Sequence, residues 1–360
     1  MPSNVLILGA SYGSLLATKL LLAGHSATLV CTRGTADVIN AKGTVVRFPI
    51  KGRADMVDID SRKLPGRLQA ATPEQVDPKA YDLVVLGMQE AQYGADGVRE
   101  LMGRIAAARK PCLAIMNMPP LPYLQRVQGL DAKALRACYT DPGVWDGFDP
   151  ALVSLASPDP QAFRPPGQPK NVLQVGLPTN FKAARFEPEA HTRLLRRLEA
   201  DIDNARFDVG GERVEIPVKL KVHDSLFVPL AKWPMLITGN YRCIREDEMV
   251  SIRDAVHGDL DQSRRIYQAV VGVCKRLGAE SGDLVPFDKY AQAASSLLKP
   301  SSAARALFGG AQQIERVELL VQLVARQLGE PTAFVDDTVR LVNERLARNR
   351  AEALETATPD

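Results

Sequence analysis

The chain has 360 residues, which is room for about two domains of roughly 100–200 residues each. Its 45 Lys and Arg against 42 Asp and Glu give a net charge of +3, while 46% of the residues are hydrophobic and 24% are charged. This composition is typical of a soluble globular protein and argues against a disordered or collagen-like chain. So small a positive excess favours neither a nucleic acid nor a membrane surface as a partner.

The numbers and spacing of cysteines and histidines indicate which disulfides and metal sites to expect. The five cysteines are odd in number and widely spaced, and the four histidines show no metal-ligand spacing. We therefore expect no disulfide framework, no metal site and a reducing, cytoplasmic compartment. No apolar run approaches the roughly 18–20 residues that a membrane span needs, and the apolar opening Val5–Leu8 is typical of a buried strand, not of a signal peptide.

The first predicted elements form a βαβ unit. Val5–Leu8 is a continuous apolar run ended by glycine, as in a parallel strand that is buried on both faces. Ser14–Ala23 follows with helix formers and a wide apolar stripe, and Gly24 ends it. Ala27–Cys31 is again apolar and rich in β-branched residues, so a second strand is predicted there.

The alternation continues and then gives way to helices. Further strands are predicted at Leu83–Leu86, at Cys112–Met116 and, closing this half, at Val172–Gly176, with a helix at 97–108 and mostly turns at 142–169. After Pro188, helical periods predominate at 191–202, 226–240, 259–277, 290–298, 311–328 and 331–349. The predicted fold class is α/β, with an N-terminal Rossmann-like dinucleotide-binding domain (1–186) followed by an all-helical C-terminal domain (187–360).

The segment between the first predicted strand and helix reads Gly9, Ala10, Ser11, Tyr12 and Gly13. Glycines there let backbone N–H groups approach a pyrophosphate at the positive end of the helix dipole. The usual fingerprint is G-x-G-x-x-G, and here Ser11 takes the place of the second glycine while Gly13 comes one residue early. We predict that these five residues bind a dinucleotide; a plain tight turn is the alternative.

The residues after the second predicted strand indicate which dinucleotide is bound. Units that prefer NAD usually carry an acid at this point, whereas an arginine suits the 2′-phosphate of NADP. The chain reads Cys31-Thr32-Arg33-Gly34-Thr35, with no acid before Asp37. Arg33 offers a bidentate guanidinium to a phosphate, so NADP (as NADPH) is the expected cofactor. A solvated loop arginine is the alternative.

One lysine stands out in the helical half. Lys232 is the only charged residue in the fifteen-residue run 226–240. Desolvation in such surroundings lowers the pKa of an ammonium group and brings a proton donor nearer to neutral pH. Asn240 is eight residues on, about two turns, and shares the face of Lys232 if the helix continues past Pro234. The alternative is a lysine whose head group simply reaches solvent.

Two weaker features complete the list of candidates. Asn117 follows the strand predicted at 112–116, at the edge where open α/β sheets bind ligands. Ser301 and Ser302 precede a predicted helix. Each has a structural alternative, since Asn117 could begin a turn and either serine could cap a helix.

Together these segments resemble the ketopantoate reductase (2-dehydropantoate 2-reductase) family over most of the chain, strongly at both ends and poorly from about 120 to 220. The opening GASYGSLLATKLLLAGHSATLVCTR resembles that of the family, with Arg33 at the arginine that takes the 2′-phosphate of NADPH. Asn117 in AIMNM resembles the asparagine beside the nicotinamide. AKWPMLITGN resembles the family's K-x-x-x-N-x-x-x-N stretch, with the catalytic lysine at Lys232 and the second asparagine at Asn240.

The closing segment resembles the family as well, but several positions depart from its pattern. In SSAARALFGGAQQIERVELLVQLVARQLG, the family's substrate-binding serine falls on Ser301 or Ser302. The family's glutamate near the cofactor falls on Gln313, with Glu315 two residues on. Leu236 replaces the first asparagine of the lysine motif, and Gln89 or Glu90 stands where the family often has a lysine. These changes leave the substrate open.

The resemblance implies an NADPH-dependent oxidoreductase that reduces a 2-oxo acid to a 2-hydroxy acid, in the family a step of pantothenate biosynthesis. Lys232 would donate a proton to the carbonyl oxygen, Asn117, Asn240 and Ser301 or Ser302 would bind the substrate, and Gln89 and Gln313 would lie near the cofactor. The expected partner is a small-molecule 2-oxo acid, with no nucleic acid or membrane, and a homodimer stays open. Two alternatives remain: an imine- or opine-type dehydrogenase acting on carbon–nitrogen bonds, and a catalytically silent NADP-binding regulatory protein.

Overall fold

The computed structural model describes residues 1–357, and the chain folds into two compact units. Unit 1 comprises Met1–Met88, Gln92–Arg126 and Gly143–Asp224. Unit 2 comprises Gln89–Ala91, Val127–Pro142 and the chain from Ser225 onward. Unit 2 is therefore assembled from three separate stretches of sequence.

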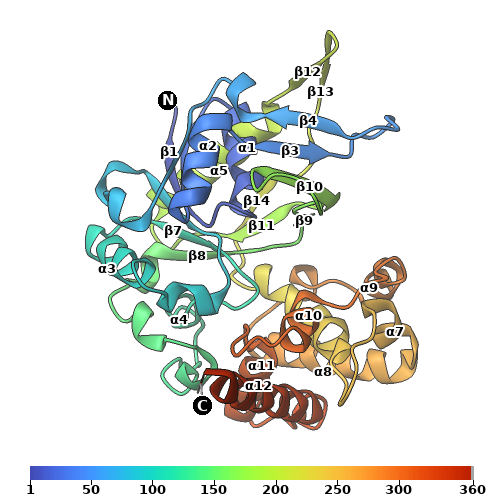
Figure 1. Ribbon diagram of the computed structural model, residues 1–360. Coiled ribbons are helices and arrows are strands. Elements are labelled where there is room, and N and C mark those ends of the chain that lie inside the picture. The colour runs from blue at the N-terminus through green and yellow to red at the C-terminus, as the bar shows by residue number, and fades with distance from the viewer. Residues whose placement is uncertain (358–360) are drawn as a thin grey trace. The chain divides into compact units, whose positions relative to one another are not determined.

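Unit 1 is built on an eight-stranded sheet with the order β14-β11-β8-β7-β6-β1-β2-β5 (Figure 1). The six strands from β8 to β5 pair in parallel, whereas β11 is antiparallel to β8 and parallel to β14. Along the chain, the parallel six follow the order 3-2-1-4-5-6 of a Rossmann fold, which confirms the predicted class. The bounds are β1 Asn4–Leu8, β2 Ser26–Val30, β5 Leu68–Ala71, β6 Leu83–Leu86, β7 Cys112–Ile115, β8 Val153–Ser157, β11 Phe181–Ala184 and β14 Leu220–His223.

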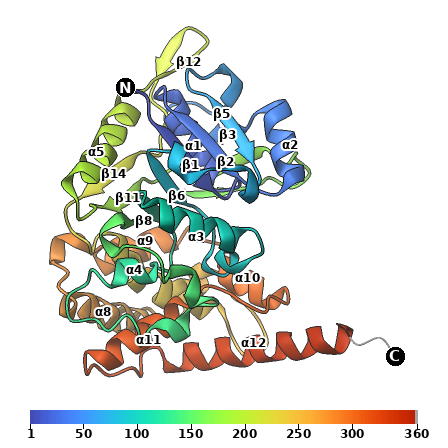
Figure 2. The same ribbon diagram turned by 90° about the vertical axis from the view of Figure 1, so that its left-hand side faces the viewer.

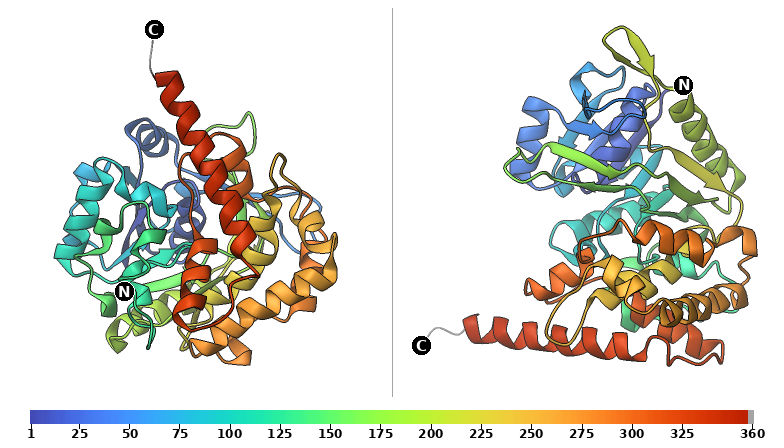
Figure 3. Two further views of the ribbon diagram at one scale, coloured as in Figure 1. Left: turned by 90° about the horizontal axis from the view of Figure 1, so that it is seen from below. Right: turned by 90° about the vertical axis from the view of Figure 1, so that its right-hand side faces the viewer.

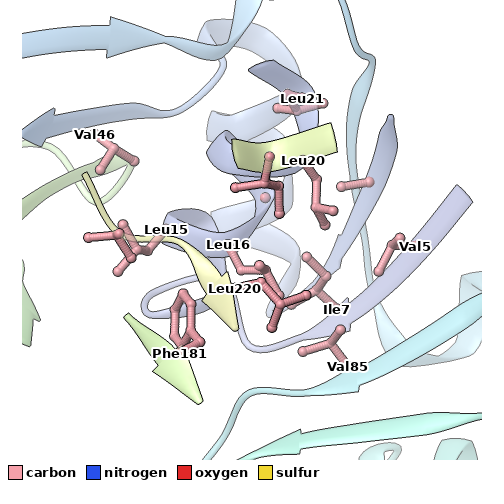
Figure 4. Close-up of a cluster of buried hydrophobic side chains, with 14 of the residues drawn as sticks. Val5, Ile7, Leu15, Leu16, Leu20, Leu21, Val46, Val85, Phe181 and Leu220 are labelled. Atoms are coloured by element: carbon pink, nitrogen blue, oxygen red, sulfur yellow. The ribbon is translucent and has the colours of Figure 1, made fainter. Parts of the chain in front are cut away.

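The core of unit 1 lies around α1 (Gly13–Leu22), which is buried on every side. Leu15, Leu16 and Leu20 of this helix pack with Ile7 of β1 and with Phe181 of β11 (Figure 4). Because side chains alternate along a strand, the fully buried neighbours of Ile7 in sequence face the opposite side of the sheet. A strand that is buried on both faces gives the continuous apolar run from which it was predicted.

A second sheet contacts α1 through its strand β3. Its order is β4-β3-β10-β9, and a separate hairpin follows later in the chain. The strand predicted at Val172–Gly176 is present as β10, and it lies in this second sheet, where it pairs with β3 and β9. The bounds are β3 Val45–Phe48, β4 Val57–Asp60, β9 Gln161–Phe163, β10 Val172–Leu177, and β12 Phe207–Val209 with β13 Glu212–Val214 for the hairpin.

The division between the units differs from the expected boundary at residue 186. Helix α5 (Glu189–Asn204) and the strands β12 to β14 belong to unit 1 (Figure 2). The apolar face of α5, which includes Leu195, Leu198 and Ile202, joins the core beside α1 and β14. A helical period predicts such a face but does not identify the layer against which it packs. The other helices of unit 1 are α2 Arg33–Lys42, α3 Val98–Ala108 and α4 Leu121–Leu124.

A buried lysine joins α1 to the segment before β14. Lys19 is only 2% exposed, and its Nζ donates to the carbonyl oxygens of Ile216 at 2.5 Å and Pro217 at 3.1 Å. Burial, with a smaller contribution from the nearby charge of Lys219, lowers the pKa of Lys19 to about 7. Val218 follows with φ +68°, a conformation that β-branched residues rarely adopt.

Unit 2 is all-helical within the described residues, apart from an isolated pairing of Ile244 with Met249. Its longest helix, α12, lies against α10 and α11 (Figure 3). The helix expected over 311–328 begins only at Val317. None of the helices within residues 1–357 combines the length and apolar character needed to cross a membrane. The bounds are α6 Lys232–Met235, α7 Ile252–His257, α8 Leu260–Arg276, α9 Phe287–Ala294, α10 Ser302–Phe308, α11 Val317–Gln327 and α12 Asp336–Ala357.

Candidate cofactor and active-site residues

The loops that follow β1 and β6 lie close together at the point where the strand order reverses. Gly9 has φ +99°, and a Cβ at this position would lie 2.9 Å from the carbonyl oxygen of Gly87 and 2.8 Å from Cγ of Met88. The N–H of Gly87 donates to the carbonyl of Leu8 at 3.0 Å. Only glycine at position 9 allows this approach. In open α/β sheets, ligands bind outside the carboxyl ends of the strands at such a switch point.

Helix α1 begins at Gly13, four residues after Gly9. A Cβ on Gly13 would lie 2.7 Å from Cγ2 of Ile7, so glycine lets the helix start close to β1. Among the described residues, no side chain caps this helix, and its first turn contains no acid. The positive end of its dipole and its first N–H groups therefore suit an anion. The segment Gly9–Gly13, the dinucleotide turn, fits a pyrophosphate because side chains at its two glycines would fill the approach.

The three residues between those glycines differ in their exposure. Ala10 is buried, and Ser11 is exposed. The hydroxyl of Tyr12 donates to the carbonyl of Pro160 at 2.6 Å, and its ring meets that of Phe181 edge-on. Burial and the nearby Asp159 raise the pKa of this hydroxyl, so it remains a neutral donor. Tyr12 thus has its side chain engaged in packing and can offer a cofactor only its backbone.

Arg33 is the first residue of α2, at the carboxyl end of β2. Its side chain is 72% exposed, and its Nη2 lies 3.7 Å from Oε1 of Glu74. A cation is disfavoured at a helix N-terminus, because the helix dipole is positive at that end. An exposed arginine at this position therefore contributes little to folding, which favours a role in binding. Asn117 lies two residues after β7 at the same edge of the sheet and is half-buried.

In unit 2, the run 226–240 does not form the single helix that was expected. A 3-10 turn at Pro229–Ala231 leads into α6, which begins at Lys232, and a π-helical turn follows at Leu236–Asn240. Pro234 has no N–H to donate, which breaks the α-helical pattern. At the end of this segment, the N–H of Tyr241 donates to the carbonyl of Leu236, the wider spacing of a π turn. We call Lys232–Asn240 the lysine turn; both of its end residues are half-buried.

Side chains from α8 and α9 hold the lysine turn in place. The hydroxyl of Tyr290 donates to the carbonyl of Met235 at 3.0 Å, and its ring stacks on that of Tyr267 at 5.4 Å. A Cβ at Gly239 would lie 2.1 Å from the Tyr290 hydroxyl oxygen, so only glycine allows this contact. After the turn, Arg242 donates to the Thr238 carbonyl at 3.3 Å and to Oγ of Ser263 at 2.7 Å.

Hydrogen bonds bring several predicted residues of unit 2 together. The hydroxyl of buried Ser301 donates to the Asn240 carbonyl at 2.6 Å and accepts from the N–H of Ala304 at 3.1 Å, capping α10. Ser302, the first residue of that helix, is exposed. The capping alternative is thus correct for Ser301, and a role in substrate binding stays a prediction for both serines.

The chain next to Asn240 extends this network to two more segments. The hydroxyl of Tyr241 donates to the Glu315 carbonyl and accepts from the N–H of Val317. The Glu315 carboxylate accepts from the N–H of Glu90 at 3.3 Å. The carboxylate of Glu90 accepts in turn from the N–H and the hydroxyl of Thr140. Gln89 and Gln313 flank this network and are both exposed, so their proposed place near the cofactor stays a prediction.

Sequence reasoning missed four residues that shape these regions. Gly87 had a visible signal, since it directly follows a buried apolar strand as Gly9 does. Glu74, Gly239 and Tyr290 had none, because each acts on a partner that is distant in the sequence or on another element. Their roles become visible only once the chain is folded.

Comparison with known proteins gives matches among solved structures only. No family model matches the sequence, and no curated protein matches it. The 2-dehydropantoate 2-reductase of Methylococcus capsulatus matches with a TM-score of 0.62 at 14% identity, covering 99% of this chain and 98% of that one. The ternary structure of D-mandelate dehydrogenase with NADH and anilino(oxo)acetate matches with a TM-score of 0.64 at 12% identity, covering 96% of this chain and 99% of that one.

A third match is the dimeric ketopantoate reductase of Staphylococcus aureus, with a TM-score of 0.60 and 12% identity over 96% of this chain and 99% of that one. At such identities the likeness concerns the fold. It covers nearly the whole chain, including the region from about 120 to 220 where the sequence resemblance is poor. The chain therefore has the fold of the ketopantoate reductases, a Rossmann-like domain followed by a helical domain.

Proposed function

We propose that this protein is an NADPH-dependent oxidoreductase that reduces a 2-oxo acid to the corresponding 2-hydroxy acid. The observation that carries the proposal is the close crossing of Gly9 and Gly87 at the switch point, followed by the start of α1. This arrangement suits a dinucleotide, and the order of the parallel strands supports the same reading. The solved structures with this fold include 2-oxo acid reductases, which supports the type of reaction.

The residues of unit 1 would hold the cofactor. Backbone N–H groups of the dinucleotide turn would bind the pyrophosphate, and Arg33 would bind the 2′-phosphate through its exposed guanidinium. The bound cofactor supplies a hydride to the carbonyl carbon of the substrate. Asn117, at the carboxyl end of β7, would orient polar groups near the nicotinamide.

The residues of unit 2 would bind the substrate and supply the proton. Lys232 donates a proton from its ammonium group to the carbonyl oxygen, which becomes the hydroxyl of the product. The π turn sets the position of Asn240 relative to this lysine, and Ser301 fixes the backbone of Asn240 through its hydrogen bond. Ser302 is the more exposed of the two serines, so its hydroxyl is the better candidate for the carboxylate of the substrate.

The substrate class stays broader than ketopantoate. Leu236 replaces an asparagine of the family motif and is buried within the lysine turn, so it offers no polar group to a substrate. The D-mandelate dehydrogenase structure contains anilino(oxo)acetate, an oxo acid derivative with an aromatic ring. We therefore include both branched aliphatic and aromatic 2-oxo acids among the candidates.

Turnover with a panel of 2-oxo acids tests the proposal. Oxidation of NADPH or NADH is followed by its absorbance with ketopantoate, shorter branched oxo acids and phenylglyoxylate, each with and without an added amine. We expect reduction of at least one oxo acid without the amine. Turnover only with the amine would favour carbon–nitrogen chemistry, and tight NADPH binding without any turnover would favour a regulatory protein.

Replacing the lysine tests the assigned proton donor. Lys232→Ala should lower kcat by about 10²–10⁴-fold, the usual contribution of general acid catalysis, and should leave NADPH affinity nearly unchanged. Lys289→Ala is the control, because Lys289 is an exposed lysine of the same unit on α9. Near-full turnover in the Lys232 variant would contradict the assignment, as would a loss that unfolding explains completely.

A homodimer is part of the proposal. It is supported by the dimeric ketopantoate reductase of S. aureus, which shares this fold. The mass of the protein in solution, measured by light scattering on a sizing column, tests it directly. The mass of a single chain at micromolar concentration would contradict the dimer without affecting the proposed reaction.

A further inference from the structure

An acid from the turn after the neighbouring strand lies beside the arginine expected to bind the 2′-phosphate. Strands β2 and β5 pair in parallel, with Val30 opposite Ala71, and the N–H of Cys31 donates to the Ala71 carbonyl at 3.0 Å. The chain after each strand therefore emerges at the same edge. Arg33 and Glu74 lie a few residues beyond these ends, with Nη2 and Oε1 3.7 Å apart.

The turn that carries Glu74 is fixed by several hydrogen bonds. The N–H of Thr72 donates to the side-chain carbonyl of Gln75 at 2.9 Å, and the N–H of Gln75 donates back to the Thr72 carbonyl at 3.1 Å. Arg104 of α3 donates to the carbonyls of Pro73 at 2.5 Å and Val76 at 2.6 Å. The backbone of Glu74 is thus held on both sides. Its side chain is 62% exposed and lies beside Arg33. Its pKa is lowered mainly by a hydrogen bond with the Thr72 side chain, with smaller contributions from the charges of Arg33 and Arg104.

Stability does not account for this pairing. An ion pair as exposed as Arg33–Glu74 contributes about 0–1 kcal/mol, and at 3.7 Å the geometry is not that of a close bidentate contact. The arginine also begins a helix, where its charge is disfavoured. The remaining physical effect is electrostatic: the carboxylate reduces the net positive charge that an incoming phosphate encounters.

We propose that Glu74 determines the cofactor preference of this protein, together with Arg33. The proposal rests on the proposed function. With NADPH, the carboxylate competes with the 2′-phosphate for Arg33 and repels its negative charge. With NADH, the same carboxylate can accept a hydrogen bond from the ribose 2′-hydroxyl, the contact that an acid after the second strand makes in NAD-dependent units. The protein therefore binds both cofactors, with a smaller preference for NADPH than Arg33 alone would give.

A further arginine lies near the end of β2. Arg164, which follows β9, lies near enough to Cys31 to lower the pKa of its thiol, although burial is the larger effect and raises that pKa to about 11. Glu74 is the acid that the structure places against Arg33, so its removal should act on the phosphate contact more than on the rest of the cofactor.

Equilibrium binding to the full-length protein tests the proposal without relying on activity. The dissociation constants of NADPH and NADH are measured by nucleotide fluorescence, and those of 2′,5′-ADP and ADP by calorimetry, for the parent chain and Glu74→Gln. We expect Glu74→Gln to bind NADPH and 2′,5′-ADP about three- to tenfold more tightly, since a like charge is removed near the phosphate. NADH and ADP should bind equally well or more weakly. The gain should shrink in high salt, because screening weakens exposed charges.

The control is Glu212→Gln, which removes an exposed glutamate from another surface pair in unit 1, with Arg53 at 2.6 Å. It should leave all four constants unchanged. An NADPH to NADH affinity ratio that is the same in Glu74→Gln as in the parent would overturn the role of Glu74 while leaving the proposed function intact. Failure of the parent protein to bind either nucleotide would instead contradict the proposed function itself.

Discussion

The two regions that carry the candidate residues are built by different means. At the carboxyl edge of unit 1, the dinucleotide turn depends on the backbone, because Gly9 and Gly13 are held where any side chain would collide. In unit 2, the lysine turn depends on side chains, since Tyr290 and Arg242 reach its carbonyl groups from outside the turn. A backbone site has no side chain that can be removed without disturbing the fold. A clamped turn can be altered one contact at a time.

The largest expected effect comes from the backbone region. Gly9→Val should lower the free energy of unfolding by more than about 3 kcal/mol, because a β-branched residue at φ +99° is strained and its Cβ meets the Gly87 carbonyl. NADPH binding should be lost together with stability. Urea unfolding and nucleotide fluorescence measure the two effects.

Two other glycines separate the contribution of backbone strain from that of the steric clash. Gly13 has an ordinary φ but a Cβ contact of 2.7 Å, so Gly13→Ala should cost about 1–2 kcal/mol. Gly34, beside Arg33 in α2, has neither a positive φ nor an atom within 4 Å of a new Cβ. Gly34→Ala should be neutral or stabilising by about 0.5–1 kcal/mol, as alanine is in a helix. A destabilised Gly34 variant would show that glycine is needed at this edge for another reason.

An intermediate effect is expected where a side chain clamps the lysine turn. Gly239→Ala should cost about 1–3 kcal/mol, because the new methyl group meets the Tyr290 hydroxyl. Tyr290→Phe should cost about 1 kcal/mol through the lost hydrogen bond to Met235. The double variant should cost less than the two single variants together, since removing the hydroxyl makes room for the methyl group. Additive losses in urea unfolding would mean that the two residues act independently.

A last expected effect concerns Lys19 and depends on pH. Its pKa is about 7 in the folded protein and near 10.5 when exposed, so between these values the unfolded chain binds more protons. Stability should therefore rise with pH across this window, by about 2 kcal/mol from pH 7 to pH 9. Lys19→Met keeps the apolar stem and removes the titration, and its unfolding free energy should lack this rise. An equal slope in both proteins would assign the effect to other groups.

Much of the parallel sheet could be predicted from the sequence, and less of the candidate site. Strand β6 was predicted with its observed bounds, and β1, β2 and α1 within one residue, because buried apolar runs ended by glycine are strong local signals. The second sheet was not predicted, since strands such as β4, with sequence VDID, are short and of mixed polarity. The order of strands and motifs also placed Gly9, Arg33 and Asn117 at carboxyl ends.

The parts of the site that escaped prediction depend on contacts between distant segments. Nothing near Arg33 in the sequence indicates Glu74, because their approach results from the pairing of β2 with β5. The π turn could be anticipated only as a disturbance at Pro234. Its actual shape depends on Tyr290, fifty-five residues after Met235 in the chain. Sequence patterns thus located the helices and strands, whereas the side-chain partners could be identified only in the folded structure.

The three-part construction of unit 2 has a consequence for the order in which the protein folds on the ribosome. When synthesis reaches Asp224, all of unit 1 has been made, whereas the stretches Gln89–Ala91 and Val127–Pro142 still lack most of their partners. The N–H of Asp131, for example, donates to the side chain of Gln327, a residue made 196 positions later. In the nascent chain, these two stretches must therefore stay exposed to solvent until α11 has been synthesised. A chain released from the ribosome before that point would have a complete main sheet but two exposed loops without their packing partners. Cellular proteases cleave exposed loops readily.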